Sequence, residues 1–118
     1  MRDLSLSRAI GDRFAKPAVS SEAEIKRFPL KDDDDEFLLL ASDGLWDVMT
    51  SQEVVDFVHQ SLKDTRNKSM DASEPSGSGV NETGARKQMA IAVANEALER
   101  GSADNVCVLI VWLTGRPR

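Results

Sequence analysis

FLLLASDGLWD, at residues 37–47, joins an apolar run to two aspartates that lie four residues apart. The run has the length of a strand, and its unbroken apolar character is typical of a strand buried on both faces. An aspartate is costly to bury unless a positive charge or a hydrogen-bond donor pairs with it. Asp43 and Asp47 are therefore expected either in a solvated turn or beside a bound cation.

A β-hairpin is expected to include this strand. Residues 22–30 (EAEIKRFPL) alternate enough for an edge strand, and Pro29 near their end fits an edge position. Residues 31–36 (KDDDDE) are expected to form the turn, because four adjacent carboxylates cannot all face one cation. The second strand of the hairpin is predicted over residues 37–42.

A helix is expected after this strand. Thr50 and Glu53 have the spacing of a capping box, in which the two side chains accept hydrogen bonds at a helix start. Apolar residues recur at helical spacing after them, and this pattern fades near residue 64. Residues 65–84 are polar and include Gly, Ser and Pro, so they predict a flexible surface loop rather than a docking segment.

A second helix is predicted over residues 85–100, with Gly101 as its C-cap. Its apolar side is expected to contain Met89, Val93, Ala97 and Leu98. Residues 105–113 (NVCVLIVWL) predict a last strand that is apolar on both faces. Strands and helices follow one another without regular alternation, so the predicted fold class is α+β. Two such strands need more cover than two helices give, so the chain is expected to form part of a larger core.

Charge and hydropathy restrict the classes of partner. A net charge of −5 and a pI of about 4.8 argue against nucleic acid and anionic membrane surfaces, which need clustered positive charge on the protein. No apolar run approaches the roughly 18 residues of a membrane span. We therefore expect neither nucleic-acid binding nor a transmembrane segment.

The chain has one cysteine, Cys107, and one histidine, His59. An internal disulfide is impossible, which favours a reducing compartment, and we expect an intracellular protein of the cytoplasm or nucleus. A zinc site of the usual Cys/His kind is nearly excluded, so a bound metal would need oxygen ligands. We expect Cys107 in a buried strand position, His59 on the surface, and both Trp46 and Trp112 in the core.

Carboxylates follow several of the predicted elements. Asp43 and Asp47 flank a strand end, Asp104 stands before the last strand, and Asp12 closes the first segment of the chain, residues 1–12. Hard anionic donors on a rigid frame are what magnesium, manganese or calcium need. Spacing alone favours a plainer alternative, in which these aspartates are turn residues that bond their own backbone.

Four segments in order carry a resemblance to a known family. They are LSLSRAIGD (4–12), KP (16–17), FLLLASDGLWDV (37–48) and RGSADNVCVLIV (100–111). Together they resemble the C-terminal half of the metal-dependent PPM family, the type 2C protein serine/threonine phosphatases. The resemblance spans about residues 4–113. It implies an α-β-β-α sandwich, a central antiparallel β-sandwich flanked by helices, of which residues 1–118 would be one portion.

The resemblance also implies a site and a chemistry. Asp43 and Asp104 match ligands of a binuclear manganese or magnesium centre, and Asp47 matches a position associated with a third, weaker metal. A water that bridges two metals is the family's nucleophile, and phosphoprotein is its substrate. Trp46 would pack beneath the site. Other residues of the matched motifs, to which we assign no metal contact, are Arg8, Asp12, Gly44 and Asn105.

The sequence departs from the family in one respect. It contains no DGH motif, which the family's N-terminal half carries with further metal ligands and a phosphate-gripping arginine. We therefore expect that residues 1–118, with the N-terminal half missing, do not turn over phosphoprotein by themselves. The alternative is a non-catalytic half-domain that binds protein partners or regulates them.

Overall fold

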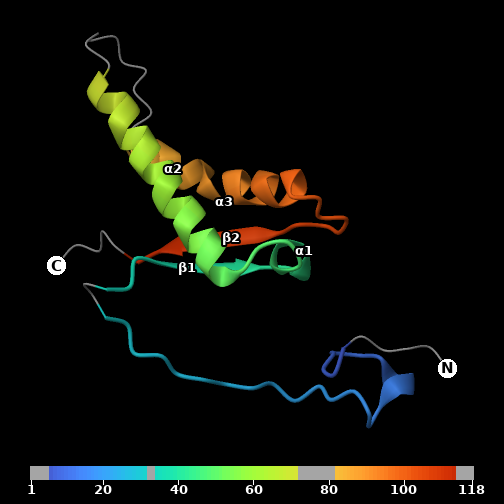
Figure 1. Cartoon of the computed structure of the whole chain (residues 1–118). Helices are drawn as coiled ribbons and strands as arrows, with labels where there is room; N and C mark the ends of the chain where they lie inside the picture. Colours follow the sequence, from blue (N-terminus) through green and yellow to red (C-terminus); the bar gives the residue numbers. More distant parts are fainter. Residues whose placement is uncertain (1–5, 32–33, 72–81, 114–118) are drawn as a thin grey trace. The chain divides into compact units, whose positions relative to one another are not determined.

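The computed structural model describes residues 6–31, 34–71 and 82–113, and it divides into two compact units, residues 1–30 and 31–118 (Figure 1). The second unit contains two strands and three α-helices among its described residues, which confirms the α+β class.

The sheet of the second unit pairs the two strongest predicted strands. Strand β1 (Phe37–Ala41) runs antiparallel to β2 (Val108–Trp112), with Phe37 opposite Trp112 and Ala41 opposite Val108. Both strands lie within the predicted ranges and are shorter than them. Two apolar strands can pair in this way although the whole helical region separates them in sequence.

The predicted hairpin is wrong. Residues 22–30 form no strand, and Ile25 and Phe28 are 87% and 78% exposed. β1 instead pairs with β2, which is apolar at every position, whereas residues 22–30 carry several charges and Pro29. The turn prediction holds for its described residues, since the carbonyl of Lys31 accepts hydrogen bonds from the N–H groups of Asp34 and Asp35 at 3.2 and 3.0 Å.

Helix α2 (Ser51–Asp71) starts as predicted. The N–H of Thr50 donates to Glu53 Oε2 at 2.8 Å, and the N–H of Glu53 donates to Thr50 Oγ1 at 3.3 Å. The helix continues well past residue 64, because Thr65–Asp71 contains neither Gly nor Pro. The loop predicted over 65–84 is therefore wrong at its start, and its centre, residues 72–81, lies outside the described residues.

Helix α3 (Glu82–Glu99) begins before the predicted start and ends in a Schellman motif. Gly101 has φ 91°, its N–H donates to Leu98 O, and the N–H of Ser102 donates to Ala97 O, both at 3.0 Å. Three of the four residues predicted on its apolar side are buried, namely Met89, Val93 and Ala97. The prediction for Leu98 is wrong, because this side chain is 54% exposed.

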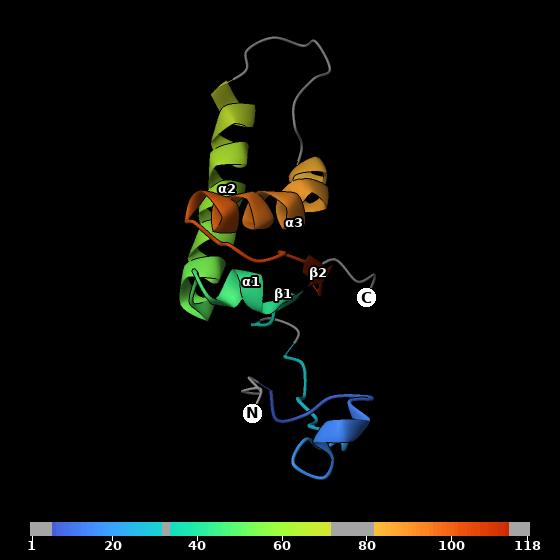
Figure 2. The same cartoon turned by 90° about the vertical axis from the view of Figure 1, so that its right-hand side faces the viewer.

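The core lies between the helices and one face of the sheet. Figures 1 and 2 show α2 and α3 on the same side of β1 and β2. The buried residues of this core are Leu45, Met49, Val54, Val58, Leu62, Met89, Val93 and Ala97. From the sheet, alternate residues such as Leu39 and Ile110 pack against them. We call this side of the sheet the covered face.

The other side of the sheet, which we call the open face, carries Leu38, Leu40, Leu109 and Val111. These side chains are 44–58% exposed. The prediction that both strands are buried on both faces is therefore wrong for the described residues. The helices among the described residues cover one face of the sheet only. The apolar pattern of the strands is typical of strands that are buried on both faces.

The first unit is a small looped structure around Val19, which is 1% exposed. Residues Arg13–Ala15 form a 3-10 turn, and Arg8 makes a parallel bridge with Ser20. Asp12 has φ 45°, in the left-handed region that a non-glycine residue rarely adopts. This unit holds the two predicted motif residues of the chain start, Arg8 and Asp12.

Candidate metal centre

The first two candidate ligands lie at the ends of a single helical turn. Helix α1 (Asp43–Trp46) begins at Asp43, and Asp47 is its C-cap, with the Asp47 N–H donating to Asp43 O at 2.8 Å. Residues four apart in a helical turn lie on one side of it. Leu45, with no exposed surface, anchors the turn in the core, while both aspartates are exposed. This geometry lets both carboxylates face the same side of the turn.

The third candidate, Asp104, lies in the loop that leaves α3 through Gly101. Asp104 is exposed, and its Oδ1 accepts a hydrogen bond from the N–H of Asn105 at 2.7 Å. This bond to its own neighbour is the local bonding expected of an aspartate in a turn. It uses one carboxylate oxygen of Asp104.

The two aspartate-bearing loops meet at Gly44. A Cβ atom on Gly44 would clash with the carbonyl oxygen of Asn105, so this close approach of two backbones requires glycine. Ser42 Oγ donates to that same Asn105 carbonyl at 3.0 Å. Gly44 and Asn105, predicted as motif residues without metal contact, thus form the junction between the two loops.

The donors suit a hard divalent cation, but they do not complete a site. Neither Asp43 nor Asp47 makes a side-chain hydrogen bond or ion pair within the part of the chain that the structure describes, so their carboxylates are available. Exposed carboxylates are the donors that magnesium and manganese take. No group of three or more His, Cys, Asp or Glu side chains that could hold a metal occurs among the described residues. A bound ion would need further ligands.

Arg8 and Asp12 belong to the first unit. Arg8 pairs with Glu24 at 3.3 Å, and its side chain is 56% exposed. Lys16 Nζ donates to Ala9 O at 2.8 Å and helps to close the loop that contains Asp12. Both motif residues are exposed within their unit.

Two of three burial predictions around the junction are wrong, and one is confirmed. Trp46 is 39% exposed, and its indole N–H donates to Ala41 O at 3.2 Å, so it closes the end of β1 rather than filling the core. Cys107 is exposed, because strand alternation places it on the side of Leu109 and Val111.

Trp112 packs against the core, as predicted, with the Arg86 guanidinium 5.0 Å from its ring centre.

An ion-pair network lies beside the junction, and only part of it can be predicted from the sequence. Arg100 Nη1 contacts Glu53 Oε1 and Arg100 Nε contacts Glu96 Oε1, both at 2.8 Å. The backbone N–H of Thr50, followed by Arg100 and the Thr50 hydroxyl, lowers the pKa of Glu53 from 4.5 to about 2. The spacing of Glu96 and Arg100 predicts their pair. The pair between Arg100 and Glu53 is long-range, so no local pattern reveals it.

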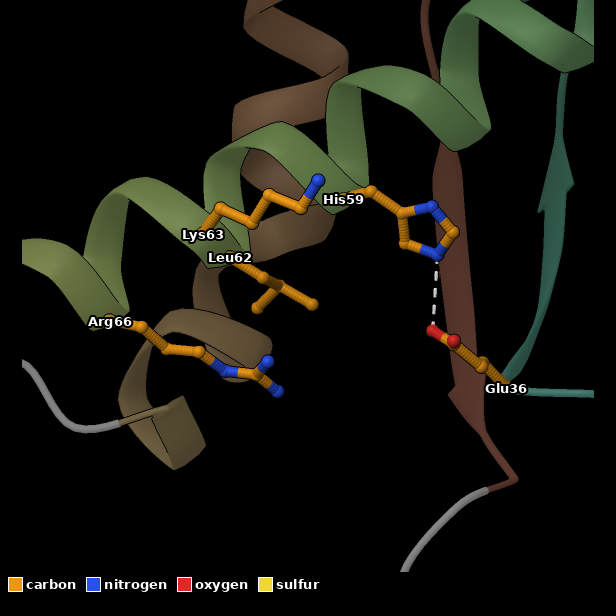
Figure 3. Close-up of a pocket in the computed structure, with 5 residues that line it drawn as sticks. All are labelled: Glu36, His59, Leu62, Lys63 and Arg66. Carbon is orange, nitrogen blue, oxygen red and sulfur yellow. Dashed lines mark hydrogen bonds and ion pairs between the residues drawn. The ribbon is translucent and has the colours of Figure 1, made fainter. Parts of the chain in front are cut away.

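A separate cavity of about 240 Å³ lies between α2 and the residue before β1 (Figure 3). Its lining residues are Glu36, His59, Leu62, Lys63 and Arg66. His59 Nε2 contacts Glu36 Oε2 at 3.1 Å, and 43% of the His59 side chain is exposed, which confirms its predicted surface position. Two permanent cations beside one carboxylate disfavour a bound metal here.

No helix within residues 6–31, 34–71 and 82–113 is long and apolar enough to cross a membrane.

Comparisons with a family model and with curated relatives agree with each other. A family model described as Protein phosphatase 2C matches residues 2–106. The chain is 42% identical over 112 residues to "Probable protein phosphatase 2C 6" of Oryza sativa subsp. japonica, covering 93% of this chain and 24% of that protein. It is 38% identical over 116 residues to "Protein phosphatase 2C 77" of Arabidopsis thaliana, covering 95% and 27%.

A further relative and a solved structure extend the comparison. "Protein kinase and PP2C-like domain-containing protein" of Arabidopsis thaliana is 40% identical over 110 residues, which are 93% of this chain and 13% of that protein. The solved "Structure of a C.elegans sex determining protein" superposes with a TM-score of 0.70 at 30% identity, covering 93% of this chain and 23% of that one. The chain thus spans between 13% and 27% of the length of these curated relatives.

Proposed function

Because this chain belongs to the protein phosphatase 2C family, we propose that it forms part of a metal-dependent protein serine/threonine phosphatase. The substrates would be phosphoserine and phosphothreonine in phosphoproteins. The observation that supports this proposal most directly is the junction at Gly44, where the loops bearing Asp43 and Asp104 meet. Two carboxylates from adjacent rigid loops are the beginning of an oxygen-ligand site.

Within this proposal, Asp43 and Asp104 hold manganese or magnesium ions, and Asp47 takes part in a third, weaker site. When bound, such ions supply positive charge against the phosphate oxygens and lower the pKa of the attacking water. The contribution of this chain is positional. Leu45 fixes α1 in the core, so that Asp43 and Asp47 remain outside it on a rigid turn.

Residues 1–118 would carry out this reaction only together with further parts of the family domain. The described residues lack a complete ligand group, and one apolar face of their sheet is open. The chain also spans at most 27% of the relatives given above. We therefore propose that a polypeptide of residues 1–118 is inactive by itself.

The proposal is tested by Asp43→Asn in the intact native protein. Removal of one charged ligand should abolish manganese-dependent hydrolysis of a phosphothreonine peptide, while the unfolding temperature without metal stays nearly unchanged, because Asp43 is exposed. Asp34→Asn, in the exposed turn before β1, is the matched control and should retain activity. Activity of Asp43→Asn within a few fold of the parent would refute the metal assignment.

A second candidate function is a non-catalytic half-domain that binds a protein partner. The open face of the sheet favours it, since contiguous exposed apolar side chains mark interaction surfaces. The two candidates differ in one measurable property. A binding module would show no metal-dependent hydrolysis even in the intact native protein, whereas the phosphatase proposal requires it.

A further inference from the structure

Two loops that carry candidate ligands are tied together by side chains that are not ligands themselves. We call residues 42–47 the Asp43 loop and residues 101–107 the Asp104 loop. A metal that takes one carboxylate from each loop needs the distance between them to be fixed. Backbone proximity at Gly44 alone does not fix it, because two loops in contact can still slide.

The first tie is made by Ser102. Its hydroxyl donates to the carbonyl of Gly44 at 2.7 Å, the shortest of the hydrogen bonds across the junction. Ser102 is half-buried, and its backbone N–H is already used in the Schellman motif of α3. The side chain therefore connects the rigid end of α3 to the residue that directly follows Asp43.

The second tie is made by Ser42, in the opposite direction. Its hydroxyl donates to Asn105 O and accepts from the Cys107 N–H, both at 3.0 Å. The Ser42 backbone N–H donates to Cys107 O, also at 3.0 Å. Each serine precedes a candidate ligand closely in sequence and bonds the main chain of the other loop. A hydroxyl that served only its own turn would not cross the junction.

The third tie lies just outside the junction. Arg100 directly precedes the Asp104 loop, and Glu53 lies in the first turn of α2, soon after the Asp43 loop. The 2.8 Å contact between these side chains joins the residue that directly follows α3 to the first turn of α2. It links the end of α3 and the start of α2, which adjoin the two loops.

We propose that Ser102, Ser42 and Arg100 are positioning residues that set the separation of Asp43 and Asp104 before a divalent ion binds. This inference rests on the proposed function. The physical reason is that ordering loops costs conformational entropy, and loops already ordered leave that cost out of metal binding. Loss of a tie should therefore weaken metal affinity, although none of these residues contacts the ion.

The test is a manganese titration of the intact native protein, with free Mn²⁺ followed by electron paramagnetic resonance. Ser102→Ala should bind Mn²⁺ about tenfold more weakly, the size of effect known for residues that orient metal ligands. Ser102→Thr keeps the hydroxyl and should restore affinity to within about threefold. Thr65→Val is the matched control, because it removes a hydroxyl that bonds Ser61 O within α2, and it should leave affinity unchanged.

If Ser102→Ala fails to fold, a second variant tests the same inference. Arg100→Met keeps most of the exposed side chain's length and removes both ion pairs, and it should weaken Mn²⁺ binding about threefold. Unfolding temperatures without and with Mn²⁺ separate the roles. A merely structural residue lowers both temperatures equally, whereas a positioning residue also reduces the stabilisation that Mn²⁺ provides.

Two outcomes overturn different statements. If Ser102→Ala and Arg100→Met bind Mn²⁺ within about twofold of the parent while Asp104→Asn loses binding, the positioning inference is wrong and the proposed function stands. If Asp104→Asn itself binds Mn²⁺ as the parent does, the proposed metal site is wrong, and the inference falls with it.

Discussion

The covered and open faces of the sheet differ in exposure although they do not differ in chemistry. Leu39 and Ile110 pack against the helical core on one side. Leu40 and Leu109, their neighbours in the same strands, are 48% and 58% exposed on the other. An apolar pattern therefore shows how many faces of a strand are built for burial, and the helices available decide how many are buried.

The difference has a consequence for stability. Burial of a leucine side chain contributes about 1.5–3 kcal/mol, and the open face forgoes part of this at each of its four large side chains. Exposed apolar patches of this kind are interaction surfaces or aggregation hazards. The covered face should accordingly carry the stability of residues 1–118, while the open face should contribute only where something covers it.

The largest effect is expected in the core above the covered face. Met89 is 3% exposed on α3, and Met89→Ala should lower the free energy of unfolding by about 3 kcal/mol through lost burial and a cavity. Ile91, on the same helix but 63% exposed, is the matched control, and Ile91→Ala should change it by less than about 0.5 kcal/mol. Urea denaturation measures both, and equal losses would break the comparison.

A smaller and conditional effect is expected on the open face. In a polypeptide of residues 1–118, Leu109→Ala should change the free energy of unfolding by less than about 0.5 kcal/mol. Within a complete family domain it should cost about 2 kcal/mol, because other parts would cover the face. Ile110→Ala, one residue on and on the covered face, should be costly in both settings. An effect of Leu109→Ala that is small in both settings would show that the open face stays exposed.

Local signals predicted the helices well. Thr50 and Glu53 form their capping box because the two residues lie three apart and need no other part of the chain. Gly101 ends α3 for an equally local reason, its left-handed backbone conformation. The end of α2 was harder to predict, because polar residues after residue 64 continue a helix without any apolar pattern to mark it.

Non-local pairings were not predictable from pattern. Residues 22–30 lie next to β1 in sequence and alternate, yet β1 pairs with β2 across the whole helical region. The exposure of Cys107 likewise depends on which face the rest of the molecule covers.

At the candidate site, spacing alone favoured isolated turns, and only the family resemblance joined Asp43 with Asp104. The bond from Ser102 to Gly44 has no sequence signature.

The smallest effect concerns how the helices that pack over the covered face are held at their ends. Backbone and hydroxyl hydrogen bonds from Thr50, together with Arg100, lower the pKa of Glu53 from 4.5 to about 2. Since the folded-state pKa is below the unfolded value, the stabilisation is complete above about pH 4.5 and is lost as the pH falls toward 2. Glu53→Gln should therefore flatten the decline of the unfolding temperature over this pH range.

The matched control for this prediction is Glu99→Gln on the neighbouring helix. Glu99 is exposed and has no ion pair with another described residue, so its variant should follow the parent's pH dependence. Thermal unfolding monitored by circular dichroism at several pH values between about 2 and 5 gives both curves. If Glu53→Gln declines as steeply as the parent, the cap and ion pair contribute nothing to the pH dependence, and burial alone holds the helices over the covered face.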